Sequence, residues 1–153
     1  MPREEKQYKI EVHVAGICFQ EFEDGVKVLI GKRQSFRKLY PNLWECGGGQ
    51  VKEGENFEEA IIRHFKNELG VIVEVVAPIG IYEILTPELD QKKIPGLKFL
   101  CQLKGYVNGK EPQIDEREFS EWRWQPIDKL DELEFIPGIS KDIQQAYQKY
   151  KEL

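Results

Sequence analysis

The sequence predicts an α/β fold in which helices cover a mixed sheet. Alternating apolar residues predict strands in several separate stretches, and apolar residues at helical spacing predict one central and one C-terminal helix. Strands interrupted by helices are typical of layered α/β domains. The chain has 153 residues, enough for one domain with its own hydrophobic core, so residues 1–153 are expected to form a single domain.

The N-terminal third is expected to form a β-hairpin followed by a long loop. Apolar residues alternate along residues 8–19 and again along residues 26–33 after a Glu-Asp-Gly turn, which is the pattern of two paired strands. Residues 34–44 contain the turn-forming pair Pro41 and Asn42, so they are expected to form the loop.

A central helix is expected over residues 57–69. Asn56 and Glu59 have the spacing of a capping box, in which each side chain bonds to a backbone N–H group of the other residue. Gly70 can adopt the left-handed conformation that ends many helices. Helical spacing places Phe57, Ile61, Ile62, Phe65 and Leu69 on one apolar face, next to a stripe of Ala60, Arg63, His64, Asn67 and Glu68.

The C-terminal half is expected to contribute the remaining strands and the second helix. The same patterns assign strands to residues 71–84, 97–107 and 121–127, polar loops to residues 85–96 and 108–120, and a helix to residues 137–153.

Composition and charge exclude several classes of protein. A net charge of −5 argues against a broad surface for nucleic acid or anionic membranes. No apolar run is long enough to cross a bilayer, and the N-terminal residues lack the apolar segment of a signal peptide. The three cysteines are widely spaced, which fits reduced thiols and a cytoplasmic location better than a zinc site.

Two features near the central helix suggest phosphate chemistry. Residues 47–49 are all glycine, so a ligand can approach the backbone closely there. On the helix, His64 lies three residues before Asn67 and four before Glu68, so the three side chains can converge. Taken separately, a glycine turn and the polar shoulder of an amphipathic helix explain these features equally well.

The joint spacing of the two features is more specific. Gly49, Glu55, Arg63, Phe65, Glu68, Gly70 and Val71 match seven of the nine specified positions of the Nudix box, G-x5-E-x7-R-E-U-x-E-E-x-G-U, where U is a bulky apolar residue. His64 and Asn67 stand where the box has Glu. The chain therefore resembles the Nudix hydrolase superfamily (MutT-like) with a degenerate box. The resemblance extends over nearly the whole chain and implies an α/β/α sandwich around a mixed sheet.

The resemblance implies a reaction and a cofactor. Nudix hydrolases cleave a pyrophosphate bond in a nucleoside triphosphate or another nucleoside diphosphate derivative, with Mg²⁺ or Mn²⁺ as the cofactor. The expected partner is thus a small nucleotide, and the resemblance also allows a homodimer. The roles that it implies are metal ligation by Glu68, Asn67, Glu118 and the Gly48 carbonyl, catalysis by Glu68, His64 and Glu118, and structural bracing by Glu55, Arg63, Gly49 and Gly70.

The two departures from the box leave alternatives open. His64 is a poor ligand for Mg²⁺ but acceptable to Mn²⁺, and it can act as a general base near neutral pH. The alternative is a catalytically reduced Nudix domain that binds a nucleotide or a protein. In the late loop Glu118 is preferred over Glu116 as the acid that faces the site, because Glu118 lies six residues before Trp124.

Three residues that precede the box are expected to bind substrate. Arg33 and Arg37 are placed to meet phosphates, and the ring of Trp44 to stack on a base. Ordinary surface charges and core packing are the alternative roles of these side chains.

Overall fold

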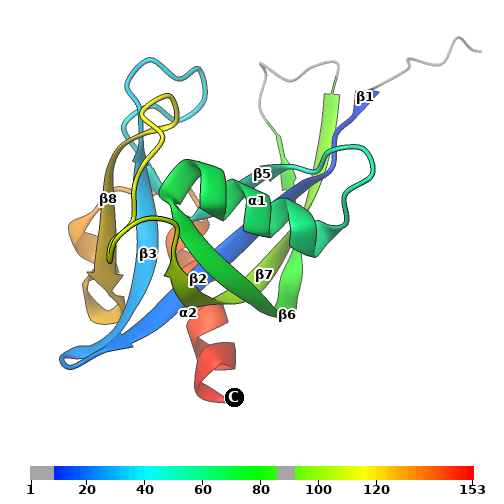
Figure 1. Cartoon of the computed structure of the whole chain (residues 1–153). Helices are drawn as coiled ribbons and strands as arrows, with labels where there is room; N and C mark the ends of the chain where they lie inside the picture. The colour runs from blue at the N-terminus through cyan, green and yellow to red at the C-terminus, as the bar shows by residue number, and fades with distance from the viewer. Residues whose placement is uncertain (1–8, 86–91) are drawn as a thin grey trace, which may run out of the picture.

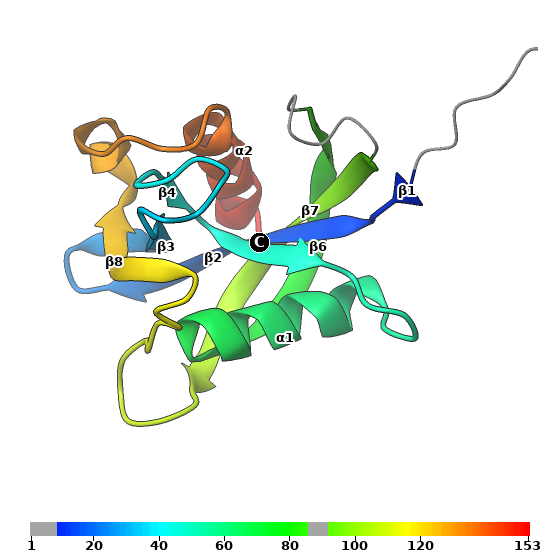
Figure 2. The same ribbon diagram turned by 90° about the horizontal axis from the view of Figure 1, so that it is seen from above.

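The chain forms three layers, with a mixed sheet between two helices. The computed structural model describes residues 9–85 and 92–153. Helix α1 (Phe57–Leu69) covers one face of the sheet, and helix α2 (Ile139–Lys151) covers the other (Figures 1 and 2). This arrangement confirms the predicted α/β/α sandwich.

Within the described residues eight strands join into the sheet, mostly by antiparallel pairing. Strand β2 lies at the centre: it pairs antiparallel with β3 and β5, and parallel with β7. Strand β6 extends the sheet beyond β7, while β8 pairs with β3 on the other side. The strands are β1 (Lys9–Ile10), β2 (His13–Phe22), β3 (Gly25–Arg33), β4 (Trp44–Glu45), β5 (Gly47–Gln50), β6 (Val71–Ile84), β7 (Lys92–Tyr106) and β8 (Phe119–Pro126).

The observed elements follow the predicted order, with four differences. The first predicted strand is split into β1 and β2, and β7 begins at Lys92, within the segment predicted to be a polar loop. The rest of that loop, residues 86–91, lies outside the described residues. A 3-10 turn, η2 (Ile127–Glu132), follows β8, and the glycines predicted to form a loop are instead strand β5.

Helix α1 begins and ends where its capping residues predict. The Asn56 side chain accepts a hydrogen bond from the Glu59 backbone at 2.8 Å, and the Glu59 side chain accepts one from the Asn56 backbone. Gly70 ends the helix in the left-handed conformation, with φ of 66°. The buried face differs from the predicted one at two positions: Ala60 is fully buried, whereas Phe57, in the first turn, remains 41% exposed.

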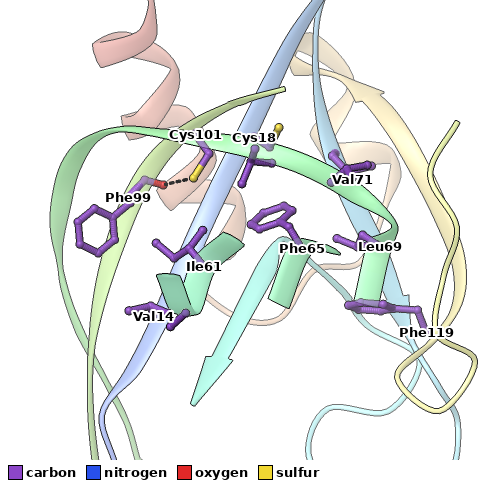
Figure 3. Close-up of a cluster of buried hydrophobic side chains, with 12 residues drawn as sticks. Val14, Cys18, Ile61, Phe65, Leu69, Val71, Phe99, Cys101 and Phe119 are labelled. Atoms are coloured by element: carbon purple, nitrogen blue, oxygen red, sulfur yellow. Dashed lines mark hydrogen bonds between the residues drawn. The ribbon is translucent and has the colours of Figure 1, made fainter. Parts of the chain in front are cut away.

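A hydrophobic core fixes α1 against the sheet. Phe65 lies at its centre, between β2, β5 and β7 (Figure 3). Gly16 and Gly47 make room for the ring, since a Cβ on either residue would lie 2.6 Å from a Phe65 ring atom. Because Gly16 and Gly47 have no side chains, the helix can approach the sheet closely at these two positions. This approach sets the position of the polar stripe of α1.

A second core fills the space between the opposite face of the sheet and α2. Phe19 packs against the rings of Tyr147 and Tyr150, with centroid distances of 5.8 and 5.1 Å. Ile143 and Ala146 of α2 are fully buried in the same cluster. The sheet is thus covered on both faces, and the polar residues of the box lie at the margin of the first core.

Candidate functional site

The loop before α1 is tied to the helix by a forked ion pair. Arg63 donates to both carboxylate oxygens of Glu55, through Nε at 2.8 Å and Nη2 at 2.7 Å. Arg63 Nη2 also donates to the Gln50 carbonyl oxygen at 2.9 Å. The hydrogen bonds from Arg63 and from the Lys52 backbone lower the pKa of Glu55 to about 2. Arg63 therefore joins α1, the loop and β5 in one contact.

His64 lies over Gly49 of the glycine strand and bridges two oxygens. Its Nδ1 is 2.5 Å from Oε2 of Glu68, and its Nε2 is 2.9 Å from the Gln50 carbonyl oxygen. A Cβ on Gly49 would lie 2.4 Å from the imidazole ring, so only glycine leaves room for it. Both ring nitrogens of His64 are thus engaged, and so is the carboxylate that the box resemblance makes a metal ligand.

The contacts of His64 determine where its protons lie. A carbonyl oxygen only accepts hydrogen bonds, so Nε2 donates to Gln50. The contact between Nδ1 and Glu68 then needs a second proton between the two atoms. Burial lowers the pKa of His64, but the hydrogen bonds to Glu68 and Gln50 outweigh it, and the net shift is upward. The two contacts and the upward direction of the pKa shift both favour the protonated imidazole opposite Glu68.

Glu45 is a further acid of the site, and Arg33 holds it. Arg33 Nη1 donates to Oε2 of Glu45 at 2.7 Å, and Arg33 Nε donates to the Leu39 carbonyl at 2.8 Å. Only 9% of Arg33 is exposed. The expected contact of Arg33 with phosphate is therefore corrected: this guanidinium fixes the loop that follows β3 and is not free for a ligand.

The late loop is clamped to the loop after β3. Arg37 Nη1 forms an ion pair with Oε2 of Glu118 at 2.8 Å, so two residues expected in the site contact each other. Gln34 reinforces the clamp by donating to the Glu116 carbonyl at 2.9 Å and to the Phe119 carbonyl at 3.1 Å. Glu116 itself is exposed. Of the two late-loop acids, Glu118 is the one that the fold holds against another functional candidate.

Trp44 is a core residue. It is 4% exposed, belongs to the cluster beneath α2, and has the Arg123 guanidinium 5.0 Å from its ring centroid. No open ring face is left for a base, so its expected role in stacking is corrected to packing. Trp44 matters to the site through its neighbour, because the strand that buries Trp44 turns Glu45 to the opposite face.

The described side chains do not fit a resident Mg²⁺ or Mn²⁺ as they stand. Hard divalent cations take six or more oxygens, with carboxylates prominent among them. In the described part of the chain, no three His, Cys, Asp or Glu side chains are placed to hold one metal ion. Asn67 is exposed and uncharged, and Glu68 is held by His64. The Gly48 carbonyl would be a single neutral donor.

The role of Gln50 escapes prediction from sequence, and for Glu45 the sequence leaves open whether the side chain points into the site or into solvent. Gln50 acts through its backbone carbonyl, which accepts from both Arg63 and His64, and a backbone contact leaves no signal in residue type. For Glu45 the sequence does give an indication: it lies between Trp44 and Cys46, which are both buried, so its side chain is expected on the opposite face of the strand. Whether such an acid meets water or an arginine depends on a partner elsewhere in the chain, here Arg33.

We predict that Arg63→Ala lowers the melting temperature as well as any activity. The substitution removes the fork to Glu55 and one of two donors to Gln50, and leaves Glu55 without its cation. Arg63→Lys keeps the charge but loses the two-point geometry, so its melting temperature should lie between those of the parent and Arg63→Ala. Circular dichroism melts check this. An unchanged melt with lost activity would mean that Arg63 contacts the substrate instead.

We also predict a pH dependence of stability that is specific to His64. Because its pKa is raised in the fold, the pair with Glu68 stabilises the protein fully below the unfolded pKa of about 6.5. That stabilisation is lost as pH rises through the higher folded pKa. The difference in unfolding free energy between the parent and His64→Gln should therefore shrink between pH 6 and pH 9 in urea titrations. A constant difference would contradict the assignment.

The comparison with His64→Gln separates the pH dependence due to His64 from that due to His13, the other histidine of the chain. Burial lowers the pKa of His13, so its protonation destabilises the fold as pH falls, which is the opposite sign. His13 is present in both the parent and His64→Gln, so the main part of its contribution, which comes from burial, cancels in the difference; the smaller effect of the His64 charge on the pKa of His13 remains.

The fold and the site together define a class of protein. A mixed sheet lies between two helices, and a glycine strand packs under a helix that is braced by Glu55 and Arg63. The model of the NUDIX domain family matches residues 10–146. The chain belongs to this family, which confirms the predicted resemblance to Nudix hydrolases.

Individual relatives are more distant. An ADP-ribose pyrophosphatase of Methanocaldococcus jannaschii is 31% identical over 90 residues, which are 59% of this chain and 51% of the relative. An isopentenyl-diphosphate Delta-isomerase of Salmonella arizonae is 39% identical over 71 residues, 44% of this chain and 37% of the relative. The matches thus span about half of the first relative and about a third of the second.

Solved structures show the same fold. A MutT protein from Methanosarcina mazei superposes with a TM-score of 0.70 at 19% identity, covering 95% of this chain and 98% of that protein. At this identity the likeness establishes the fold alone. Among the described residues, no helix is both long and apolar enough to span a membrane.

Proposed function

We propose that this protein is a Nudix pyrophosphohydrolase that cleaves the pyrophosphate bond of a nucleoside diphosphate derivative or a nucleoside triphosphate, with Mg²⁺ or Mn²⁺ required for turnover. The observation that carries the proposal is the placement of Glu68 beside the glycine strand, with the Glu55–Arg63 brace holding helix to strand. The family membership supports the same reaction class.

The ligand class follows from what the relatives share. One relative is named for ADP-ribose and the other for isopentenyl diphosphate, so the organic groups differ but the diphosphate is common. Strand β5 supports this choice, because its glycines leave peptide groups uncovered by side chains where a diphosphate could be bound. We accordingly place recognition in the diphosphate and leave the organic group open.

The residues of this chain have distinct roles in the proposal. Glu68 is the box acid that His64 links to the glycine strand, and His64 is placed to exchange a proton with it. Arg37 and Glu118 close one side of the site by joining two loops. A cytoplasmic location and a single small nucleotide partner belong to the same proposal, and the three cysteines, all buried free thiols, fit that location.

The test is release of phosphate, pyrophosphate or a nucleoside monophosphate from a panel of compounds. ADP-ribose, the nucleoside triphosphates and a dinucleoside polyphosphate should be incubated with Mg²⁺, with Mn²⁺ and with EDTA. We expect turnover of at least one compound with a divalent cation and none with EDTA. Absence of turnover across the panel, with a folded protein, would remove the enzyme assignment.

One observation favours a second candidate, a catalytically reduced Nudix domain that binds a nucleotide or a protein. The acids around the glycine strand are all occupied by basic side chains of the same chain. If calorimetry shows that a compound of the panel binds but none is hydrolysed, this second candidate replaces the first.

A further inference from the structure

The site neutralises its own acids. Four carboxylates lie around the glycine strand and the end of the late loop, and each contacts a basic side chain within 2.5 to 2.8 Å. Every pair is partly buried, with between 10% and 31% of each side chain exposed. The four pairs are Glu45–Arg33, Glu55–Arg63, Glu68–His64 and Glu118–Arg37.

These pairs form one electrostatic unit. Burial raises the pKa of Glu45 above its ordinary value, and the charge of Glu68 contributes to the increase, while Arg33 and Arg37 act in the opposite direction. Arg37 is also the partner of Glu118, so the acids of β4 and the late loop both lie within range of the same guanidinium. The hydrogen bond to Glu55 is the main cause of the raised pKa of Arg63, and the charge of Glu68 also contributes to it.

A free divalent cation gains little from such a site. To reach a carboxylate, the metal ion must first displace the basic side chain that is paired with it. In a partly buried pair, the displaced side chain then loses the charge that compensated it. Substitution of two box acids by His64 and Asn67 removes the spare carboxylates that would otherwise remain. The occupied donor atoms explain why the described side chains offer no resident metal site.

A cation already bound to a diphosphate is a different ligand. Mg²⁺ binds proteins mostly through one or two carboxylates and fills its other positions with water and substrate phosphates. The diphosphate oxygens supply the ligands that this chain lacks, and they carry about two negative charges that the cation balances. A nearly neutral complex suits a site whose own charges are already paired.

We propose that the divalent cation is not resident in this protein and binds only together with the diphosphate, as a metal–diphosphate complex. The inference rests on the proposed function, because it concerns the substrate of the same site. It makes the cation part of the substrate: the free chain recognises the complex, and Glu68 is the acid that the complex would meet on α1.

The first test measures Mn²⁺ alone by isothermal titration calorimetry. The parent should show no saturable binding up to millimolar Mn²⁺, whereas His64→Glu with Asn67→Glu should bind Mn²⁺ at least about tenfold more tightly. Lys66→Glu on the exposed side of α1 adds two negative units outside the site and is the control for added charge, which should behave as the parent. His64→Ala, which frees Glu68 without adding acids, serves if the double variant does not fold.

The second test uses α,β-methylene-ADP, whose diphosphonate cannot be hydrolysed between its phosphorus atoms. Its affinity for the parent should be about ten to a hundred times higher in Mg²⁺ than in EDTA, because cation and ligand bind together. The variant His64→Glu with Asn67→Glu is expected to bind Mn²⁺ without the analogue, so in that variant an ion is already present before the analogue binds. Equal affinity of the parent with Mg²⁺ and with EDTA would overturn the proposal, as would tight binding of Mn²⁺ to the parent without the analogue.

These binding results are independent of the turnover assay. If the parent hydrolyses a compound of the panel but also binds Mn²⁺ alone, the enzyme assignment stands and this inference fails. If the analogue binds only with Mg²⁺ but no compound is hydrolysed, the inference about the ligand stands and the enzyme assignment fails.

Discussion

Glu68→Gln is expected to reduce turnover by at least about 100-fold while leaving the melting temperature close to that of the parent. Gln has the same size as Glu and can still accept a hydrogen bond from His64, so the packing of α1 should not change. The substitution removes the one helix acid that remains from the Nudix box, which contacts the His64 ring over Gly49. The measurement is kcat/KM with Mg²⁺ on the best compound of the panel, together with a thermal melt.

A second carboxylate on the same helix provides the control. Glu58 lies in the exposed first turn of α1, away from the polar stripe. Glu58→Gln should leave both turnover and melting unchanged, which shows that loss of any α1 charge is not enough. Parent-like turnover in Glu68→Gln would mean that the reaction does not use this acid, and the site would have to be sought around Glu45 and Glu118.

Gly48→Ala is expected to destabilise the protein by about 3 kcal/mol. Gly48 has φ of 138°, a conformation that residues with side chains rarely adopt, and a Cβ there would lie 2.1 Å from the Val14 carbonyl oxygen. That obstacle is backbone of the central strand, so it cannot move aside as a flexible side chain could. Relief of the clash would pull β5 away from β2, and with it the carbonyl of Gln50.

The matched control for this prediction is Gly54→Ala. Gly54 also has positive φ, 82°, but no atom outside its neighbours lies within 4 Å of a Cβ there. It should therefore show only the backbone strain, about 1 kcal/mol. Urea unfolding at 25 °C compares the two, and equal losses would show that the approach of β5 to β2 is not critical.

Local patterns predicted much of the fold correctly, for reasons that lie within a few residues. Asn56, Glu59 and Gly70 set both ends of α1, because capping depends on side chains and backbone groups less than one turn apart. Alternation predicted the β2–β3 hairpin and β6 in the same way. The family resemblance then supplied the sandwich, which local patterns alone leave open.

The errors occur where a residue's role depends on a distant partner. The glycines after Cys46 show no alternation, yet they form β5 because β2 offers a free edge for pairing and Phe65 needs the space. Phe57 fits the apolar stripe by spacing but remains exposed, since it lies at the end of α1 where the core stops. Trp44 was expected at the ligand and is buried beneath α2.

For the site, the sequence by itself determined which chemical groups are available. The box spacing predicted that Glu55 and Arg63 meet where loop and helix join, and the structure places them in a forked pair. It also showed that His64 and Asn67 replace two acids of the box. These conclusions need only helical periodicity and residue type, both of which are local properties of the chain.

Only the tertiary structure decided which groups are free. Arg33 and Arg37 looked like phosphate ligands, but folding brings them to Glu45 and Glu118, which lie 12 and 81 positions further along the chain. His64 looked like a spare base, and β5 places the Gln50 carbonyl so that the ring is fixed between it and Glu68. The physical reason is that an ion pair forms wherever burial makes an unpaired charge costly, and burial is a property of the packed chain and not of its sequence neighbours.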